Sequence, residues 1–165
     1  KRFVLETDQY GELIEGLSSG PARVGVGFHS LRAVPRDELS AVIDFAGPEA
    51  PIHGHIAEQK AEVSEIVGAY GKRPVEFLLA EQEVDRRFHL VHATHVNDDE
   101  VDALAKAKAH VVICPSTEAN LGDGIFPLVR YAKAGGRFSI GTDSHTTLNP
   151  LEDLRWLDYA ALGLA

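Results

Sequence analysis

The amino-acid sequence predicts a parallel α/β fold, and three observations support that prediction. Five short apolar runs alternate with segments whose apolar residues recur at helical spacing. The carboxyl ends of these runs lie roughly 20 to 36 residues apart, which is enough for a helix between successive strands. Glycine, proline or asparagine stands at most of the boundaries. Both an open doubly wound sheet and part of a (β/α) barrel fit this alternation.

The composition is that of a globular chain of ordinary size. The 165 residues are 44% hydrophobic and 25% charged, which is typical of one folded domain. The net charge of -9 argues against nucleic acid or an anionic membrane surface as a partner. Cys114 is the one cysteine, so no internal disulfide can form and a reducing, cytoplasmic location is expected. No apolar run approaches the ~20 residues that span a bilayer.

Helix and strand signals alternate through the first half of the chain. Apolar residues recur at helical spacing between positions 10 and 17, and a Ser-Ser-Gly-Pro run ends this helix. Valine and phenylalanine alternating with glycine over 23–28 indicate a buried strand. Pro35 opens the next helix, because proline is favoured in a first turn. The elements predicted after it are a strand over 51–57, a helix over 63–70 and a short helix over 74–82.

The second half of the chain repeats the alternation. After a strand over 88–93, Asn97 is a good N-cap residue with Glu100 three positions later, a variant of the capping box. The apolar run over 110–114 predicts the fourth strand, and the glycine, asparagine and aspartate of 116–126 predict a loop. The remaining elements are a helix over 127–134, a strand over 137–141 and a final helix that begins at Pro150.

Polar residues follow four of the five predicted strands. His53 and His55 are two residues apart, so both point to the same face of a strand. In a barrel, all the loops at the carboxyl ends of the strands line one mouth. A single histidine at a strand end is most often a hydrogen-bonded structural residue, but four such positions at one edge indicate an active site. The four positions are His29, His55 with Glu58, His92 with His95, and Asp143 with His145.

These residue types suit metal-assisted hydrolysis. Imidazole nitrogen and carboxylate oxygen are ligands for Zn²⁺, although iron and nickel remain open. A bound metal acidifies a water molecule for attack on a polarised carbon. Glu58 is a candidate proton donor to the leaving group. Asp143 is a candidate metal ligand and acceptor of the water's proton, and His92 is a candidate partner of the water or of the oxyanion.

Two further residues have competing interpretations. Arg32 follows His29 closely, and a guanidinium at the mouth suits a substrate carboxylate through two parallel hydrogen bonds. The alternative for Arg32 is a solvated arginine at the start of a helix. Cys114 follows an apolar run, so we interpret it as a buried packing residue rather than a reactive thiol.

Four motifs together resemble the amidohydrolase superfamily. The long run from Cys114 to Phe126 and the pair His29/Arg32 are most similar to the formimidoylglutamate deiminases within it. The matching residues extend from Arg23 to Tyr159, most of the chain. The motifs are His55-Ile-Ala-Glu-Gln59, His92-Ala-Thr-His95, Cys114-Pro-Ser-Thr-Glu-Ala-Asn-Leu-Gly-Asp-Gly-Ile-Phe126 and Gly141-Thr-Asp-Ser-His145.

The resemblance implies a (β/α)8 TIM barrel with one zinc site. His55 and Asp143 would be zinc ligands. Glu58 would move protons, and His92 would support the hydrolytic water. The implied reaction is hydrolysis of the formimino C–N bond of N-formimidoyl-L-glutamate, a step of histidine degradation, which gives N-formyl-L-glutamate and ammonia. The implied substrate is therefore a small acidic molecule, and His29 with Arg32 would hold its glutamate part.

The chain matches only about strands four to eight of such a barrel. Nothing before His29 offers the His-x-His pair that the family's first strand contributes to the zinc site, and the flanking β-sandwich is also absent. We therefore expect residues 1–165 to form a partial-barrel domain with two exposed sheet edges that favour a homo-oligomer. Two other interpretations stay open: a related aminohydrolase of a ring substrate, and an incomplete, non-catalytic remnant.

Overall fold

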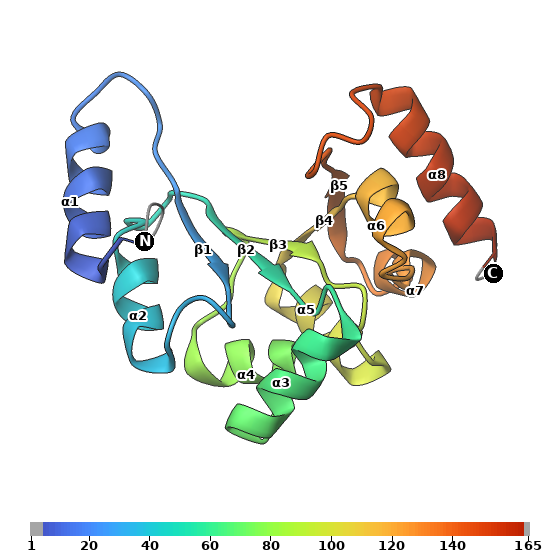
Figure 1. Ribbon diagram of the computed structural model, residues 1–165, viewed down its shortest axis with the longest axis horizontal. Coiled ribbons are helices and arrows are strands. Elements are labelled where there is room, and N and C mark those ends of the chain that lie inside the picture. The colour runs from blue at the N-terminus through green and yellow to red at the C-terminus, as the bar shows by residue number, and fades with distance from the viewer. Residues whose placement is uncertain (1–4, 164–165) are drawn as a thin grey trace.

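The structure, a computed structural model that describes residues 5–163, contains one parallel sheet of five strands (Figure 1). The sheet order β1-β2-β3-β4-β5 is the order of the sequence. A doubly wound sheet reverses its order at a switch point, whereas the strands of a barrel follow the chain. The order therefore selects the partial-barrel alternative. The strands are β1 (Val26–Ser30), β2 (Ile52–Ile56), β3 (Phe88–His92), β4 (His110–Ile113) and β5 (Arg137–Ile140).

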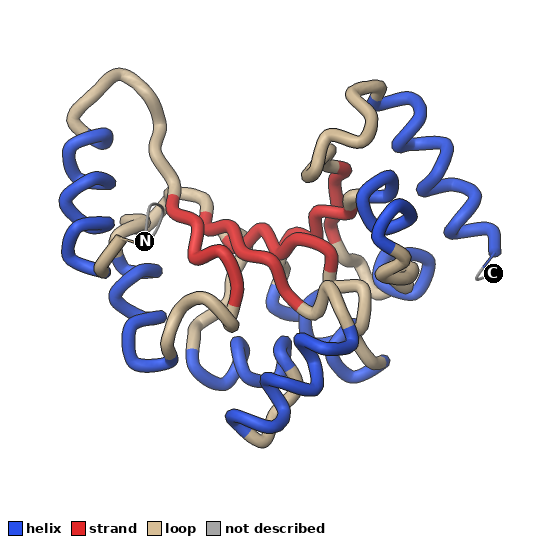
Figure 2. Tube along the Cα trace, viewed as in Figure 1, coloured by secondary structure: helices blue, strands red, loops and turns tan. Residues whose placement is uncertain are grey.

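Eight helices accompany the sheet in the described part of the chain. They lie on the outer side of the curved sheet, and α3, α4 and α5 cover its middle (Figures 1 and 2). A helix lies between each pair of successive strands, as parallel connections require. The helices are α1 (Thr7–Ser18), α2 (Arg36–Asp44), α3 (Lys60–Tyr70), α4 (Pro74–Glu81), α5 (Asp98–Ala107), α6 (Pro115–Leu121), α7 (Leu128–Lys133) and α8 (Pro150–Gly163).

The hydrophobic core lies between the sheet and these helices. Along β2 the two isoleucines and Gly54 are buried, whereas His53 and His55 alternate with them and point to the other face. Gly54 has no room for a side chain, because a Cβ there would meet the ring of Phe28. Burial of an isoleucine side chain contributes about 1.5–3 kcal/mol. The apolar alternation therefore decides which face of the sheet carries the histidines.

The predicted loop over 116–126 is wrong in its first half, which forms helix α6. Pro115 occupies the first turn, and Gly122 ends the helix with a left-handed φ of 71°. Asn120 and the small polar residues before it suggested a loop, but a proline at the start and a glycine at the end delimit a short helix equally well. The irregular segment begins only after Gly122.

The first strand also lies later than predicted. It spans Val26–Ser30 rather than 23–28, so His29 lies within β1 and not after it. The two edges of the described sheet are β1 and β5. Among the helices within residues 5–163, none combines the length and hydrophobicity needed to cross a bilayer.

Candidate metal-binding active site

Three residues predicted from the sequence meet at the carboxyl end of the sheet. His55, His92 and Asp143 each offer a ligand atom, and these atoms all lie within 4.8 Å of one another. His55 Nε2 is 3.8 Å from Asp143 Oδ1. The imidazole rings of His55 and His92 are stacked, with their centroids 5.5 Å apart. Strands β2 and β3 and the loop after β5 thus bring two imidazoles and one carboxylate together.

The backbone is strained at several of the site positions. His29, His92 and Asp143 have φ values of 55°, 70° and 45°, in the left-handed region that non-glycine residues rarely adopt. His92 belongs by alternation to the helix-facing side of β3, with Phe88 and Leu90. The left-handed turn at its end allows the His92 ring to lie against that of His55. Strain of this kind is typical of functional sites.

A backbone carbonyl orients His55. His55 Nδ1 lies 2.9 Å from the carbonyl oxygen of His29, and a carbonyl can only accept, so Nδ1–H donates. With Nδ1 held in this way, Nε2 is the ring nitrogen that faces Asp143. Ligand histidines in metal sites are generally held in this way through their second nitrogen.

His92 lies between two carboxylates and is 1% exposed. Its Nδ1 is 3.1 Å from Glu118 Oε1, and its Nε2 is 3.8 Å from Glu58 Oε1. Burial lowers the pKa of His92, but the hydrogen bond with Glu118 and the negative charge of Glu58 raise it, and the net pKa lies above the usual value. The ring is therefore both fixed in place and electrostatically coupled to Glu58.

Glu58 has the environment of a proton-transfer group. Burial raises its pKa, while the charge of His92 opposes this and the charge of Asp123 adds to it. A carboxyl group with a raised pKa exchanges protons closer to neutral pH. The buried carboxylate of Glu62 accepts hydrogen bonds from the backbone N–H groups of Ala57 and Glu58, both at 2.9 Å, and so fixes the turn that carries Glu58.

Of the two predicted substrate-binding residues, His29 lines a cavity beside the candidate ligands and Arg32 does not. His29 lines a cavity of about 300 Å³ together with His55 and Asp143, and its ring centroid is 5.2 Å from that of His55. Arg32 is not among the residues that line this cavity. Its Nη1 lies 3.7 Å from Glu65 Oε2, and both side chains are exposed. A surface ion pair of this kind contributes only about 0–1 kcal/mol, so it leaves the guanidinium available to a ligand.

The other histidines noted in the sequence stand apart from the three candidate ligands. His53 lines the same cavity, but its ring stacks on that of His89 with centroids 4.6 Å apart. Burial lowers the pKa of His53, which favours its neutral form. His145 is exposed, and the backbone carbonyl of His95 accepts a hydrogen bond from Arg73.

Cys114 is a buried packing residue, as the sequence indicated. Its side chain is 2% exposed. Burial raises the pKa of the thiol to about 12, and the negative charge of Glu118 acts in the same direction. The reactive thiolate is therefore strongly disfavoured.

Two adjacent residues of α6 support the site and were missed in the sequence. Thr117 Oγ1 donates to the carbonyl of Thr142 at 3.2 Å and accepts from the backbone N–H of Ser144 at 3.2 Å, on either side of Asp143. Glu118 contacts His92. Both belong to the motif Cys114–Phe126, but the loop prediction gave no indication of which of its side chains turn toward β3 and toward the loop after β5.

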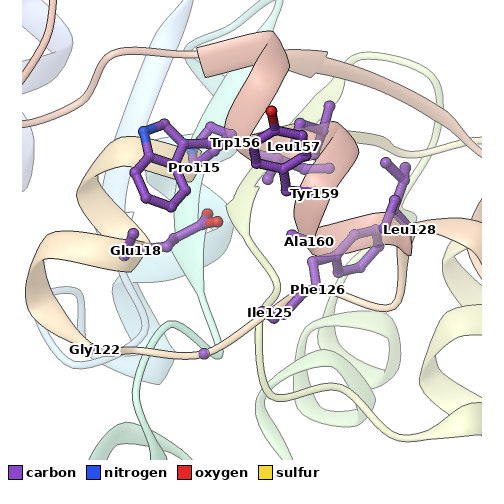
Figure 3. Close-up of a pocket in the computed structure, with 14 residues that line it drawn as sticks. Pro115, Glu118, Gly122, Ile125, Phe126, Leu128, Trp156, Leu157, Tyr159 and Ala160 are labelled. Carbon is purple, nitrogen blue, oxygen red and sulfur yellow. The ribbon is translucent and has the colours of Figure 1, made fainter. Parts of the chain in front are cut away.

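A separate apolar cavity of about 410 Å³ lies between α6, the loop after it and α8 (Figure 3). Phe126, Trp156 and Leu157 are among its lining residues, and Glu118 is the one carboxylate that lines it. It carries none of the three candidate ligands. We therefore place the chemistry at the smaller, histidine-lined cavity.

The donor set fits a divalent transition metal. Two imidazoles and one carboxylate are a usual set of protein ligands for a catalytic zinc ion, which keeps a further position for water or substrate. The residues that would hold the ion are His55 and Asp143, with His92 beside them. The geometry supports a metal site without identifying the metal, because N and O ligands also suit iron and nickel.

The chain is similar in sequence and in structure to known proteins. The family model described as "Amidohydrolase family" matches residues 3–162. A formimidoylglutamate deiminase of Pseudomonas aeruginosa is 43% identical over 163 residues, which are 96% of this chain and 36% of that protein. The chain thus spans little more than a third of this relative.

Two solved structures share the fold. The crystal structure of an amidohydrolase from Brucella melitensis has a TM-score of 0.92 at 46% identity, and the match covers 96% of this chain and 36% of that one. The structure of an adenosine deaminase from Xanthomonas campestris with bound zinc has a TM-score of 0.85 at 26% identity, covering 95% and 37%. In both, the matched part is again just over a third of the solved chain.

Proposed function

The chain belongs to the amidohydrolase family, and on this premise we propose that it supplies catalytic residues for the hydrolysis of N-formimidoyl-L-glutamate to N-formyl-L-glutamate and ammonia. The observation that carries the proposal is the convergence of His55, His92 and Asp143 within 4.8 Å, with Glu58 beside them. The relative from Pseudomonas aeruginosa, named as a formimidoylglutamate deiminase, supports this choice of substrate.

The proposed metal is zinc. His55 and Asp143 would hold the zinc ion, which would supply Lewis acidity that lowers the pKa of the attacking water. Zinc is supported by the donor set and by the zinc-bound adenosine deaminase of similar structure. The chain's own residues do the remaining work, which is to orient the reactants and to move protons.

Glu58 is the proposed proton carrier. Burial raises its pKa, so its carboxyl group can both take a proton from water and return it near neutral pH. The returned proton goes to the =NH nitrogen of the amidine as the water oxygen adds to the carbon. Asp143 then takes the proton of the new hydroxyl group, and this second proton passes to the same nitrogen, which leaves as ammonia while the carbonyl forms. His92 Nε2, 3.8 Å from Glu58 Oε1, is placed to hydrogen-bond the water or the oxyanion that develops on the carbon.

His29 and Arg32 are the proposed contacts of the substrate's acidic part. His29 lies in the cavity beside His55. Arg32 follows it in the turn after β1, where its exposed guanidinium is paired only loosely with Glu65. An arginine can hold a carboxylate through two parallel hydrogen bonds, and a substrate with two carboxylates would displace the weak contact with Glu65.

A substrate panel tests this proposal. The purified chain, supplied with zinc, is assayed for ammonia release from N-formimidoyl-L-glutamate and from adenosine, a neutral ring amine. Release from the acidic amidine with little from adenosine supports the proposal. Preference for adenosine would instead support the second candidate, a ring aminohydrolase, which the likeness to an adenosine deaminase favours. Bound zinc without turnover of either compound would indicate a non-catalytic remnant.

A further inference from the structure

Glu118 is a buried carboxylate to which the proposed reaction gives no role. It is 4% exposed. Its Oε1 lies 3.1 Å from His92 Nδ1 and accepts a hydrogen bond from the backbone N–H of Cys114 at 2.9 Å. A buried carboxylate is costly unless it is hydrogen-bonded, so the contact with His92 is one of two that satisfy this oxygen.

We propose that Glu118 is a positioning residue that holds His92 as the Nδ1–H tautomer, with the lone pair of Nε2 turned toward the reaction site. An ionised carboxylate only accepts hydrogen bonds, so the contact requires a proton on Nδ1. A neutral imidazole carries one proton, and Nε2 then has none. Nε2 faces Glu58 Oε1 at 3.8 Å, on the side of the proposed chemistry.

The surroundings of His92 disfavour an orientation in which its ring is flipped by 180°. His92 is almost fully buried and stacks on His55. A flip of the ring by 180° would put a carbon in place of Nδ1 opposite Glu118. Glu118 Oε1 would then lack one of its two donors, and a buried polar group left without a partner is destabilising.

Glu118 itself is held by α6. Its backbone N–H donates to the carbonyl of Cys114 at 2.9 Å. Its carbonyl accepts hydrogen bonds from the N–H groups of Gly122 and Asp123. The backbone of Glu118 is therefore fixed on both sides, and the side chain folds back toward the carboxyl ends of β3 and β4. These hydrogen bonds hold the segment after β4 as the helix α6 rather than as a loop.

The catalytic consequence rests on the proposed function, whereas the tautomer can be measured without turnover. With Nε2 unprotonated, His92 can accept a proton or a hydrogen bond from the attacking water. With Nε2 protonated, it could only donate. Glu118 would thus decide which of these two tasks His92 performs in the hydrolysis.

The test is the tautomer of His92 in the full 165-residue chain. The chain is labelled with 15N at histidine and kept free of metal, and the pH is raised until the His92 ring is neutral, because its pKa lies above the usual histidine value. Long-range 1H–15N correlation spectra distinguish a protonated from an unprotonated ring nitrogen. The His92→Asn spectrum identifies the His92 signals among the eight histidines.

Three variants isolate the contribution of Glu118. Glu118→Gln keeps an acceptor oxygen and should retain the Nδ1–H tautomer. Glu118→Met removes the acceptor and should move His92 toward the Nε2–H tautomer that free histidine prefers. Glu100→Met is the matched control, since Glu100 is an equally buried carboxylate that pairs with Arg73 and accepts the backbone N–H of Asn97, away from His92. This control should leave the tautomer of His92 unchanged.

An Nε2–H tautomer in the unaltered chain overturns the inference, and this measurement needs no variant to fold. A folded Glu118→Met chain that keeps the Nδ1–H tautomer overturns it as well. Because no substrate is present, the result is independent of the substrate panel: a correct tautomer with no ammonia release would refute the proposed reaction but not the positioning by Glu118.

Discussion

Single residues of the site combine a strained backbone conformation with hydrogen bonds that offset the cost of the strain. His29, His92 and Asp143 have left-handed backbones, and each such position costs of order 1–3 kcal/mol. Hydrogen bonds from α6 compensate at two of them, since Thr117 holds both sides of Asp143 and Glu118 holds the ring of His92. These residues are therefore presented in fixed orientations, which a metal site requires.

Substitution of the single residue Arg32 tests whether the substrate is acidic. Arg32→Ala should raise KM for N-formimidoyl-L-glutamate by about tenfold to a hundredfold, because hydrogen bonds to a charged group contribute about 1.5–3 kcal/mol. Steady-state kinetics of ammonia release measures the change. Arg36→Ala is the control, since Arg36 pairs with Glu81 on the surface at 2.9 Å and should leave KM unchanged. An unaltered KM in Arg32→Ala would remove Arg32 from the substrate site.

Cys114 gives a prediction about reactivity. Its pKa of about 12 means that the thiolate stays scarce at pH 8, and burial blocks access to it. Far below the pKa the thiolate fraction rises about tenfold per pH unit, so raising the pH from 8 to 9 should accelerate the slow reaction of the folded chain about tenfold. We expect one thiol per chain to react with a disulfide reagent promptly in guanidinium and at least about a hundredfold more slowly in the folded chain. Equal rates in both conditions would contradict the burial of Cys114.

At the scale of elements, α6 matters most to the site. It lies between β4 and the loop that carries Asp143, and its adjacent residues Thr117 and Glu118 contact that loop and His92. The predicted loop over 116–126 missed it, because a helix of this length has no apolar periodicity to detect. By contrast, the long helices α3 and α5 were predicted from periodicity and capping residues.

Two glycine substitutions test the helices, one at the end of α6 and one inside α3. Gly122→Ala should destabilise the chain by about 1–2 kcal/mol, because Gly122 ends α6 with a φ of 71° that disfavours an L side chain. Gly68→Ala should stabilise it by about 0.5–1 kcal/mol, since Gly68 lies inside α3 and a Cβ there meets nothing within 4 Å. Urea unfolding measures both. Stabilisation by Gly122→Ala would show that α6 does not end there.

At the scale of the whole molecule, the order of the strands in the sheet identifies the fold as a partial barrel. The alternation of strands and helices could be predicted from apolar periodicity, and so could the residues His55, Glu58, His92 and Asp143 at strand ends. The choice between an open sheet and a barrel could not be made from the alternation, because it depends on which strands pair; the resemblance to amidohydrolases predicted the partial barrel, and the strand order confirms it. The exact strand limits were also missed at β1, where glycines leave the apolar pattern without a clear boundary.

The open edges of the sheet lead to a prediction about assembly. β1 and β5 have no further neighbour within the described residues, and β5 is largely exposed. Leu151 and Tyr159 on α8 add exposed apolar surface. Unpaired edges and apolar surface favour association. Sedimentation at increasing concentration should give masses above the 17.9 kDa of one chain. A mass of one chain at every concentration would contradict the predicted homo-oligomer.

Zinc titration of the purified chain tests the central claim, that His55 and Asp143 are part of a metal site. Calorimetry should show about one zinc ion per chain, the stoichiometry of a single site. Asp143→Asn should weaken binding by at least about tenfold, because it removes a charged ligand. Asp102→Asn, which alters an acid paired with Arg130 on the surface, should bind zinc as the unaltered chain does. Equal zinc affinity in the unaltered chain and in Asp143→Asn would contradict the account.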